Sequence, residues 1–136
     1  MTTLFSGEFA AATESLAAVR EAVRAACVQA GCDEESGGQI VLAVNEACMN
    51  IIQHAYAFAP DATFRLRLQH ADGILTVQLL DNGKPASLAD LRPRELDDVR
   101  PGGLGVHFMR ATMDAVEYLS PPAGFVNLLQ LSKRIA

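Results

Sequence analysis

Two strand-like runs joined by a tight turn constrain the fold of this chain more than any other feature. Residues 62–70 (ATFRLRLQH) alternate apolar and polar side chains, and residues 74–80 (ILTVQLL) form a second run. Such alternation is typical of a strand with one buried face. Ala71, Asp72 and Gly73 lie between the two runs and favour a hairpin turn. The sequence therefore predicts antiparallel pairing at this point.

Two helices are predicted ahead of this hairpin. Residues 11–30 are rich in alanine, and Gly31 follows them as a helix C-cap. A second helix is predicted to begin at Asp33, to run to Phe58, and to stop before Pro60 because the residue preceding a proline disfavours helix. The apolar positions at helical spacing in the first helix are Leu16, Val19, Val23, Ala26 and Ala30.

The remaining segments complete the element order. Residues 3–9 are predicted to form a short edge strand, and the polar, proline-containing segment 86–101 to form a mobile connection. A third helix is expected over about 104–113, followed by strands over 115–119 and 125–133. Helices must bury their apolar stripes, and one face of a single sheet can bury them all. The predicted fold is an α+β two-layer sandwich, with a mixed, mostly antiparallel sheet and helices on one face.

Size and composition favour one ordinary domain over residues 1–136, with its own core. The net charge of −5 argues against direct nucleic-acid binding, which needs a basic face, but allows binding of a single nucleotide. The chain has 3 cysteines without CxxC spacing, which indicates reduced thiols in a cytoplasmic protein. No run approaches the roughly 20 apolar residues of a membrane span, and no signal peptide is predicted.

A polar stripe follows the second helix. Glu46, Asn50 and His54 are spaced i, i+4 and i+8, roughly opposite an apolar stripe, and residues 39–59 contain no lysine or arginine. Amide and carboxylate oxygens suit Mg²⁺, and a glutamate one turn away can position a hydroxyl for attack. A solvated helix face is the alternative, and His54 alone fits a structural role. The apolar stripe comprises Val44, Cys48, Ile51 and Ala55.

Asp81 and Gly83 follow the end of the second hairpin strand. A buried carboxylate at this point can accept a hydrogen bond from the exocyclic amine of a ligand. Gly83 permits a backbone path that other residues cannot follow, and it lets a ring approach the main chain. A plain turn is the alternative, because aspartate, asparagine and glycine favour turns for local reasons.

A glycine-rich segment precedes the third helix. Gly102, Gly103, Leu104 and Gly105 lead into an amphipathic stretch. A glycine loop at a helix N-terminus presents free N–H groups, which suit phosphates. The segment lacks the GK[ST] ending of a Walker A loop and the spacing of a dinucleotide fingerprint, so it is also compatible with a flexible turn.

The order of the three features resembles the Bergerat ATP-binding fold, the superfamily of gyrase, the histidine kinases and MutL. The segments NEACMNIIQHAY, LLDNGKP, PGGLGVHFMRATMDAVEY and LLQLSKRI are similar to those of the anti-sigma-factor serine kinases of bacterial partner-switching systems. The likeness extends over about residues 5–135. It implies ATP and Mg²⁺ as cofactors.

The resemblance also implies residue roles. Asn50 matches the Mg²⁺-binding asparagine, Glu46 the base toward an attacking hydroxyl, and His54 a histidine usual in these kinases. Asp81 matches the aspartate that recognises the adenine amino group, with Gly83 packed by the ring.

The glycines at 102, 103 and 105, with Leu104, match an ATP lid that spans about residues 86–105. The last strand of the superfamily often carries a threonine near the base, and Gln130 and Ser132 are both open for that position.

The resemblance implies an anti-sigma factor that also phosphorylates a serine or threonine of an anti-sigma-factor antagonist. Its partners would be a sigma factor and that antagonist, without membrane or direct nucleic-acid binding. A homodimer through the N-terminal strand or first helix is expected from the same likeness. A nucleotide-gated binding module without kinase activity is the alternative. A histidine-kinase catalytic domain is disfavoured, because the first helix contains no histidine.

Overall fold

Five strands form one antiparallel sheet in the computed structural model, which describes residues 1–86 and 103–136 and only the backbone of 103–107. The strands are β1 (Thr2–Ala10), β2 (Thr63–Ala71), β3 (Ile74–Asp81), β4 (Ala115–Leu119) and β5 (Asn127–Arg134). Their order is β1-β2-β3-β5-β4, and every neighbouring pair is antiparallel. The predicted hairpin of 62–70 with 74–80 is confirmed, and the two strands expected at the end of the chain also pair antiparallel.

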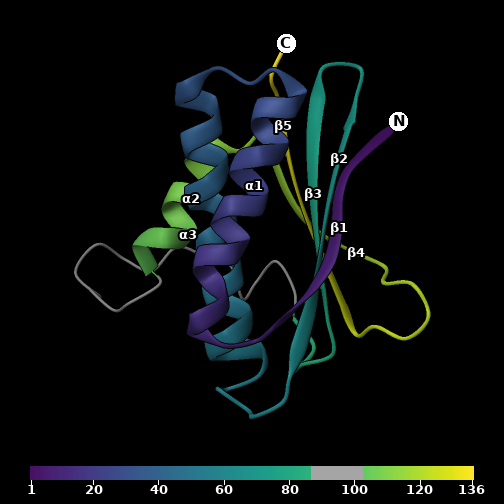
Figure 1. Cartoon of the computed structure of the whole chain (residues 1–136). Coiled ribbons are helices and arrows are strands. Elements are labelled where there is room, and N and C mark those ends of the chain that lie inside the picture. The colour runs from purple at the N-terminus through teal and green to yellow at the C-terminus, as the bar shows by residue number, and fades with distance from the viewer. Residues whose placement is uncertain (87–102) are drawn as a thin grey trace.

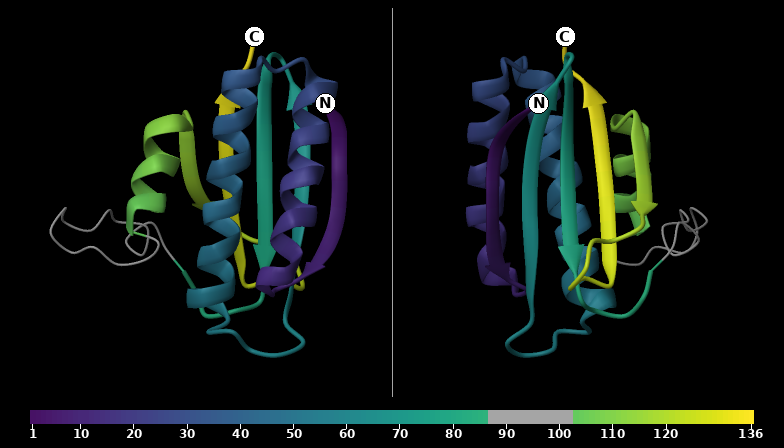
Figure 2. Two further views of the ribbon diagram at one scale, coloured as in Figure 1. Left: turned by 60° about the vertical axis from the view of Figure 1, so that its left-hand side comes forward. Right: turned by 90° about the vertical axis from the view of Figure 1, so that its right-hand side faces the viewer.

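Three α-helices cover one face of this sheet (Figures 1 and 2). They are α1 (Leu16–Ala30), α2 (Glu34–Asn50) and α3 (Gly103–Thr112). A 3-10 turn, η1 (Thr13–Ser15), precedes α1, and a π-helical turn, η2 (Ile51–Ala55), continues α2. The predicted two-layer α+β sandwich is confirmed. None of the helices in the described ranges is long and apolar enough to cross a membrane.

Strand alternation separates the two faces of the sheet. On the helix-covered face, β2, β3 and β5 contribute a continuous buried layer, which comprises Leu66, Leu68, Val77, Leu79, Leu129 and Leu131. On the other face, Arg67 donates to Gln78 at 3.2 Å, and Gln78 donates to Gln130 at 2.9 Å. Apolar side chains therefore pack against the helices, and a polar row crosses the open face.

The caps of the helical hairpin match the sequence signals. Gly31 ends α1 in the left-handed conformation, at φ 83°. Asp33 caps α2 by accepting a hydrogen bond from the Ser36 amide at 2.7 Å. This bond lowers the pKa of the Asp33 carboxyl, because it favours the charged form. Val19 and Val23 of α1 are buried, as the helical spacing predicts.

The second helix ends earlier than predicted. Regular α-helix stops at Asn50, and η2 ends at Ala55. Ala57 and Phe58 then adopt left-handed backbone conformations, with φ of 48° and 60°. The prediction that the helix continues to Phe58 is therefore wrong, because the chain turns out of the helix before Pro60 can limit it.

Candidate functional site

Asp81 lies at the end of β3, on the helix-covered face of the sheet, and is only 4% exposed. Its Oδ1 atom accepts hydrogen bonds from the Gly83 amide and from Asn127 Nδ2, both at 2.9 Å. Its Oδ2 atom accepts none from the described part of the chain. One oxygen is thus held by the protein, and the other remains available to a donor on a ligand.

Asn127 is a site residue that the sequence analysis missed. It pairs with Asp81 across β3 and β5, and it is buried. Besides its bond to Asp81, Asn127 Nδ2 donates to the Lys84 carbonyl at 2.9 Å, and its Oδ1 accepts from the Ala86 amide at 2.9 Å. One amide therefore fixes both the carboxylate and the loop after β3. The alternation of FVNLLQLSK, with Asn127 in phase with Leu129, could have identified it.

Gln130 and Ser132, the two positions left open in the last strand, do not face this site. Gln130 pairs with Gln78 and bonds to it on the open face, and Ser132 lies two residues further along the same face. The polar residue of β5 on the Asp81 side is Asn127 instead, because side chains alternate between faces along a strand.

Gly83 lies directly against the π-helical turn. A Cβ atom at this position would lie 2.5 Å from the Ala55 carbonyl oxygen and 2.7 Å from its carbon. The next amide, that of Lys84, donates to the same Ala55 oxygen at 2.8 Å. A glycine is thus required at position 83 for the loop after β3 to contact η2. This explanation for Gly83 does not depend on a ligand ring packing against it.

We expect Gly83→Ala to destabilise the chain by about 1–3 kcal/mol, because rigid backbone would have to shift to admit the methyl group. Gly38→Ala is the matched control, since its Cβ would meet nothing within 4 Å and it lies in α2. That change should stabilise by about 0.5–1 kcal/mol. Urea unfolding measures both free energies, and a loss at Gly38 equal to that at Gly83 would contradict the close-contact explanation.

Tyr56 ties the loop after β3 to the start of β2. Its hydroxyl donates to the Thr63 carbonyl at 2.8 Å and accepts from the Asn82 amide at 2.7 Å. Burial raises the pKa of this phenol, and the bond from Asn82 opposes the rise. Tyr56 therefore remains protonated near neutral pH and keeps both bonds.

The predicted polar stripe lies along α2 and η2. Glu46 and Asn50 are half-buried, and His54 is exposed. No hydrogen bond or ion pair occupies the side chains of these three residues within the described ranges. The neighbouring Asn45, by contrast, accepts from Arg20 at 2.9 Å. Half-buried polar groups without protein partners are suited to a ligand or a metal ion.

The glycine-rich segment is only partly described. Gly102 and most of the predicted lid over 86–105 lie outside the described residues. Gly103, Leu104 and Gly105 form the first turn of α3, so they belong to the helix and not to a loop before it. The far end of α3 is fixed, because Lys133 Nζ donates to the Thr112 carbonyl at 2.6 Å. The helix packs beside α2 (Figure 2).

Residues 9–133 match the family described as histidine kinase-like ATPase domain. The chain belongs to this family. The match includes strands β2, β3 and β4, most of β5, the α2 stripe, the Asp81 loop and α3. It confirms the ATP-binding superfamily that the three sequence features indicate.

Individual relatives of this chain are named as protein kinases or as an anti-sigma factor. The serine/threonine-protein kinase BtrW of Bordetella bronchiseptica is 32% identical over 83 residues, 58% of each chain. An anti-sigma F factor of Clostridium botulinum is 28% identical over 116 residues, 80% of this chain and 79% of the relative. The serine-protein kinase RsbW of Bacillus subtilis is 32% identical over 55% of this chain and 52% of its own length.

A solved structure shows the same fold. The RsbU and RsbW domains of Rv1364c from Mycobacterium tuberculosis align with a TM-score of 0.69 and 19% identity, covering 99% of this chain and 32% of that one. At this identity the likeness concerns the fold alone. The five-stranded antiparallel sheet with helices on one face is thus an arrangement known for an RsbW domain.

Proposed function

We propose that this protein binds Mg·ATP and transfers the γ-phosphoryl group to a serine or threonine of an anti-sigma-factor antagonist, and that it otherwise binds a sigma factor. The names of three relatives, two of them kinases and one an anti-sigma factor, support this class of activity. The observation that carries the proposal is the Asp81 carboxylate, with Oδ1 held by Gly83 and Asn127 and Oδ2 open.

In this proposal each residue of the site has one task. The open oxygen of Asp81 accepts the adenine amino group. The Asn50 amide oxygen is a ligand for Mg²⁺, and the glycines at the start of α3 approach the phosphates through their N–H groups. The Glu46 carboxylate accepts the proton of the attacking hydroxyl. Phosphoryl transfer depends mainly on positioning and charge neutralisation, so no covalent intermediate is needed.

The Mg²⁺ assignment is tested at Asn50. Asn50→Ala removes the ligand oxygen, so we expect ATP affinity to lose its dependence on Mg²⁺ while affinity without metal stays within about twofold. Calorimetric titration with and without Mg²⁺ measures this difference. Asn45→Ala is the matched control, because Asn45 lies on the same helix as Asn50 and its amide oxygen already accepts a hydrogen bond from Arg20 of α1. An Asn50→Ala protein that keeps full metal dependence would place the ion elsewhere.

A nucleotide-gated binding module without kinase activity is the second candidate. One relative is named only as an anti-sigma factor, and it shares the longest aligned segment of the three. In this case ATP would order the site without transferring phosphate. The Glu46 substitution argued in the Discussion separates the two candidates.

The proposal extends to assembly and location. The strand β1 lies at one edge of the described sheet (Figure 1), where a second copy can pair with its free backbone groups. We therefore include a homodimer through β1 or α1, and a cytoplasmic location. Light scattering of the purified chain tests the dimer.

A further inference from the structure

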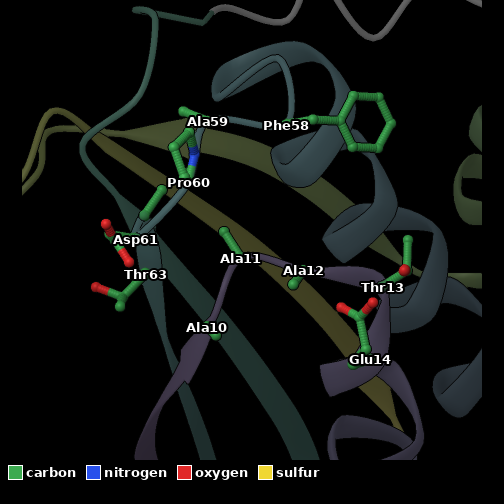
Figure 3. Close-up of a pocket in the computed structure, with 11 residues that line it drawn as sticks. Ala10, Ala11, Ala12, Thr13, Glu14, Phe58, Ala59, Pro60, Asp61 and Thr63 are labelled. Atoms are coloured by element: carbon green, nitrogen blue, oxygen red, sulfur yellow. The ribbon is translucent and has the colours of Figure 1, made fainter.

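A pocket lies where β1 leads into α1, at the end of the molecule opposite the two termini (Figures 1 and 3). Two segments line it, residues 10–14 and residues 58–63. Its volume of about 510 Å³ is in the range of pockets that hold a ligand. Neither Asp81 nor the α2 stripe contributes to it, so it is separate from the proposed nucleotide site.

The lining combines an apolar floor with acidic sides. Ala11 and Ala12 lie between the carboxylates of Asp61 and Glu14 (Figure 3). None of the lining residues is basic, and neither Asp61 nor Glu14 forms an ion pair within the described residues. The nearby Glu8, which accepts from the Thr63 hydroxyl at 3.1 Å, lies opposite Arg65 in the β1–β2 register and does not line the pocket, so the acidic character rests on Asp61 and Glu14. The pocket thus favours a ligand that is apolar at its centre and positive at its edges.

The loop that forms one wall is held in an unusual conformation. Ala57, Phe58 and Asp61 all have positive φ, at 48°, 60° and 63°. This conformation is unfavourable for Ala57 and Phe58, whereas aspartate tolerates it. Backbone bonds fix this shape, among them Phe58 N to the Ile52 carbonyl at 2.9 Å and Ala11 N to the Ala62 carbonyl at 2.7 Å. As a result, Phe58 is presented at the surface with 61% of its area exposed. Strain that the structure maintains in this way is common at binding sites.

We propose that this pocket docks a segment of a partner protein in which an apolar side chain is flanked by lysine or arginine. The apolar residue would lie on the alanine floor against Phe58, and the flanking cations would pair with Glu14 and Asp61. An anionic ligand is disfavoured by the same carboxylates.

The docking pocket is also connected to the loop after β3. Thr63 lines the pocket, and its carbonyl accepts from Tyr56, whose hydroxyl accepts from the Asn82 amide beside Asp81. The two hydrogen bonds of the Tyr56 hydroxyl thus link the pocket to the loop that would contact adenine. This connection rests on the proposed nucleotide site, whereas the docking itself does not.

The test is an NMR titration of the nucleotide-free, ¹⁵N-labelled chain with the acetylated peptide amide KKLFKK and its acidic counterpart EELFEE. We expect saturable amide shifts in residues 10–14, 58–59 and 61–63 with the basic peptide alone. In the Glu14→Gln/Asp61→Asn variant the dissociation constant should rise at least tenfold. Both side chains are exposed, and asparagine tolerates the left-handed conformation of Asp61, so this variant should fold.

The matched control is Glu35→Gln/Asp72→Asn, which removes the same charge from exposed sites outside the pocket. Its dissociation constant should stay within about twofold of the parent, and Phe58→Ala should weaken binding. Shifts centred elsewhere, equal weakening in both double variants, or no saturable shift would overturn the proposal. Because no nucleotide is present, this outcome is independent of ATP binding.

Discussion

Asp81→Asn will strongly weaken adenine-nucleotide binding while the fold is retained. In the parent, Asp81 Oδ1 accepts from Gly83 and Asn127. The asparagine oxygen can keep both bonds, so its NH₂ group must take the place of Oδ2. A donor would then face the amino group of adenine, which is also a donor. We expect affinity for ATP to fall on the order of 100-fold, or about 2.8 kcal/mol.

Calorimetric titration measures the affinity, and thermal unfolding of the nucleotide-free chain checks the fold. Asp72→Asn is the matched control, since Asp72 lies exposed in the β2–β3 turn and should bind ATP like the parent. GTP offers a second comparison, because its ring carries a carbonyl where adenine carries the amine. If Asp81→Asn binds ATP within twofold of the parent, Asp81 does not recognise adenine.

The parts of the fold that the sequence predicts are those that local patterns determine. The alternation of 62–70, the Asp33 cap and the left-handed Gly31 each depend on a few neighbouring residues. Asp81 belongs to this group, because a carboxylate at the end of an apolar run must lie at the end of a strand. Its position on the helix-covered face follows from period-two alternation with Leu79.

The features that sequence patterns do not predict are those that depend on contacts between distant segments. Asn127 and Asp81 are 46 residues apart, and only the register of β3 with β5 brings them together. The π-helical turn and the contact of Gly83 with Ala55 likewise depend on how the end of α2 meets the loop after β3. The position left open between Gln130 and Ser132 did not need the register, because alternation with Leu129 and Leu131 already places both side chains on the open face.

The bonds of Asn127 and the contacts with the end of α2 together hold residues 82–86 in place without a ligand. The Asn127 side chain forms hydrogen bonds with the main chain of Lys84 and Ala86. The Lys84 amide also donates to the Ala55 carbonyl, and the Asn82 amide donates to the Tyr56 hydroxyl. Preorganisation of this kind lowers the entropy that a ligand must lose on binding. The open Asp81 oxygen is therefore already placed, and discrimination between nucleotides is expected to reside in this loop.

Glu46→Gln will slow phosphoryl transfer without weakening ATP binding. The amide keeps the size of the side chain but cannot accept the proton of a serine hydroxyl as a carboxylate does. Removal of a general base costs roughly 100- to 10,000-fold in rate, so we expect phosphoryl transfer to fall by that range. ATP affinity should stay within about twofold, because in the proposed site Asn50, not Glu46, holds the metal ion.

Single-turnover transfer from labelled ATP to the purified antagonist protein measures the rate, and calorimetry measures the affinity. Glu35→Gln is the matched control, because Glu35 is an exposed glutamate on the same helix and should leave both quantities unchanged. Transfer at the parent rate in Glu46→Gln would exclude Glu46 as the base. If the parent chain binds ATP but transfers no phosphate, the kinase proposal fails and the nucleotide-gated binding module is the remaining function, since Asp81 and Asn50 would then serve binding alone.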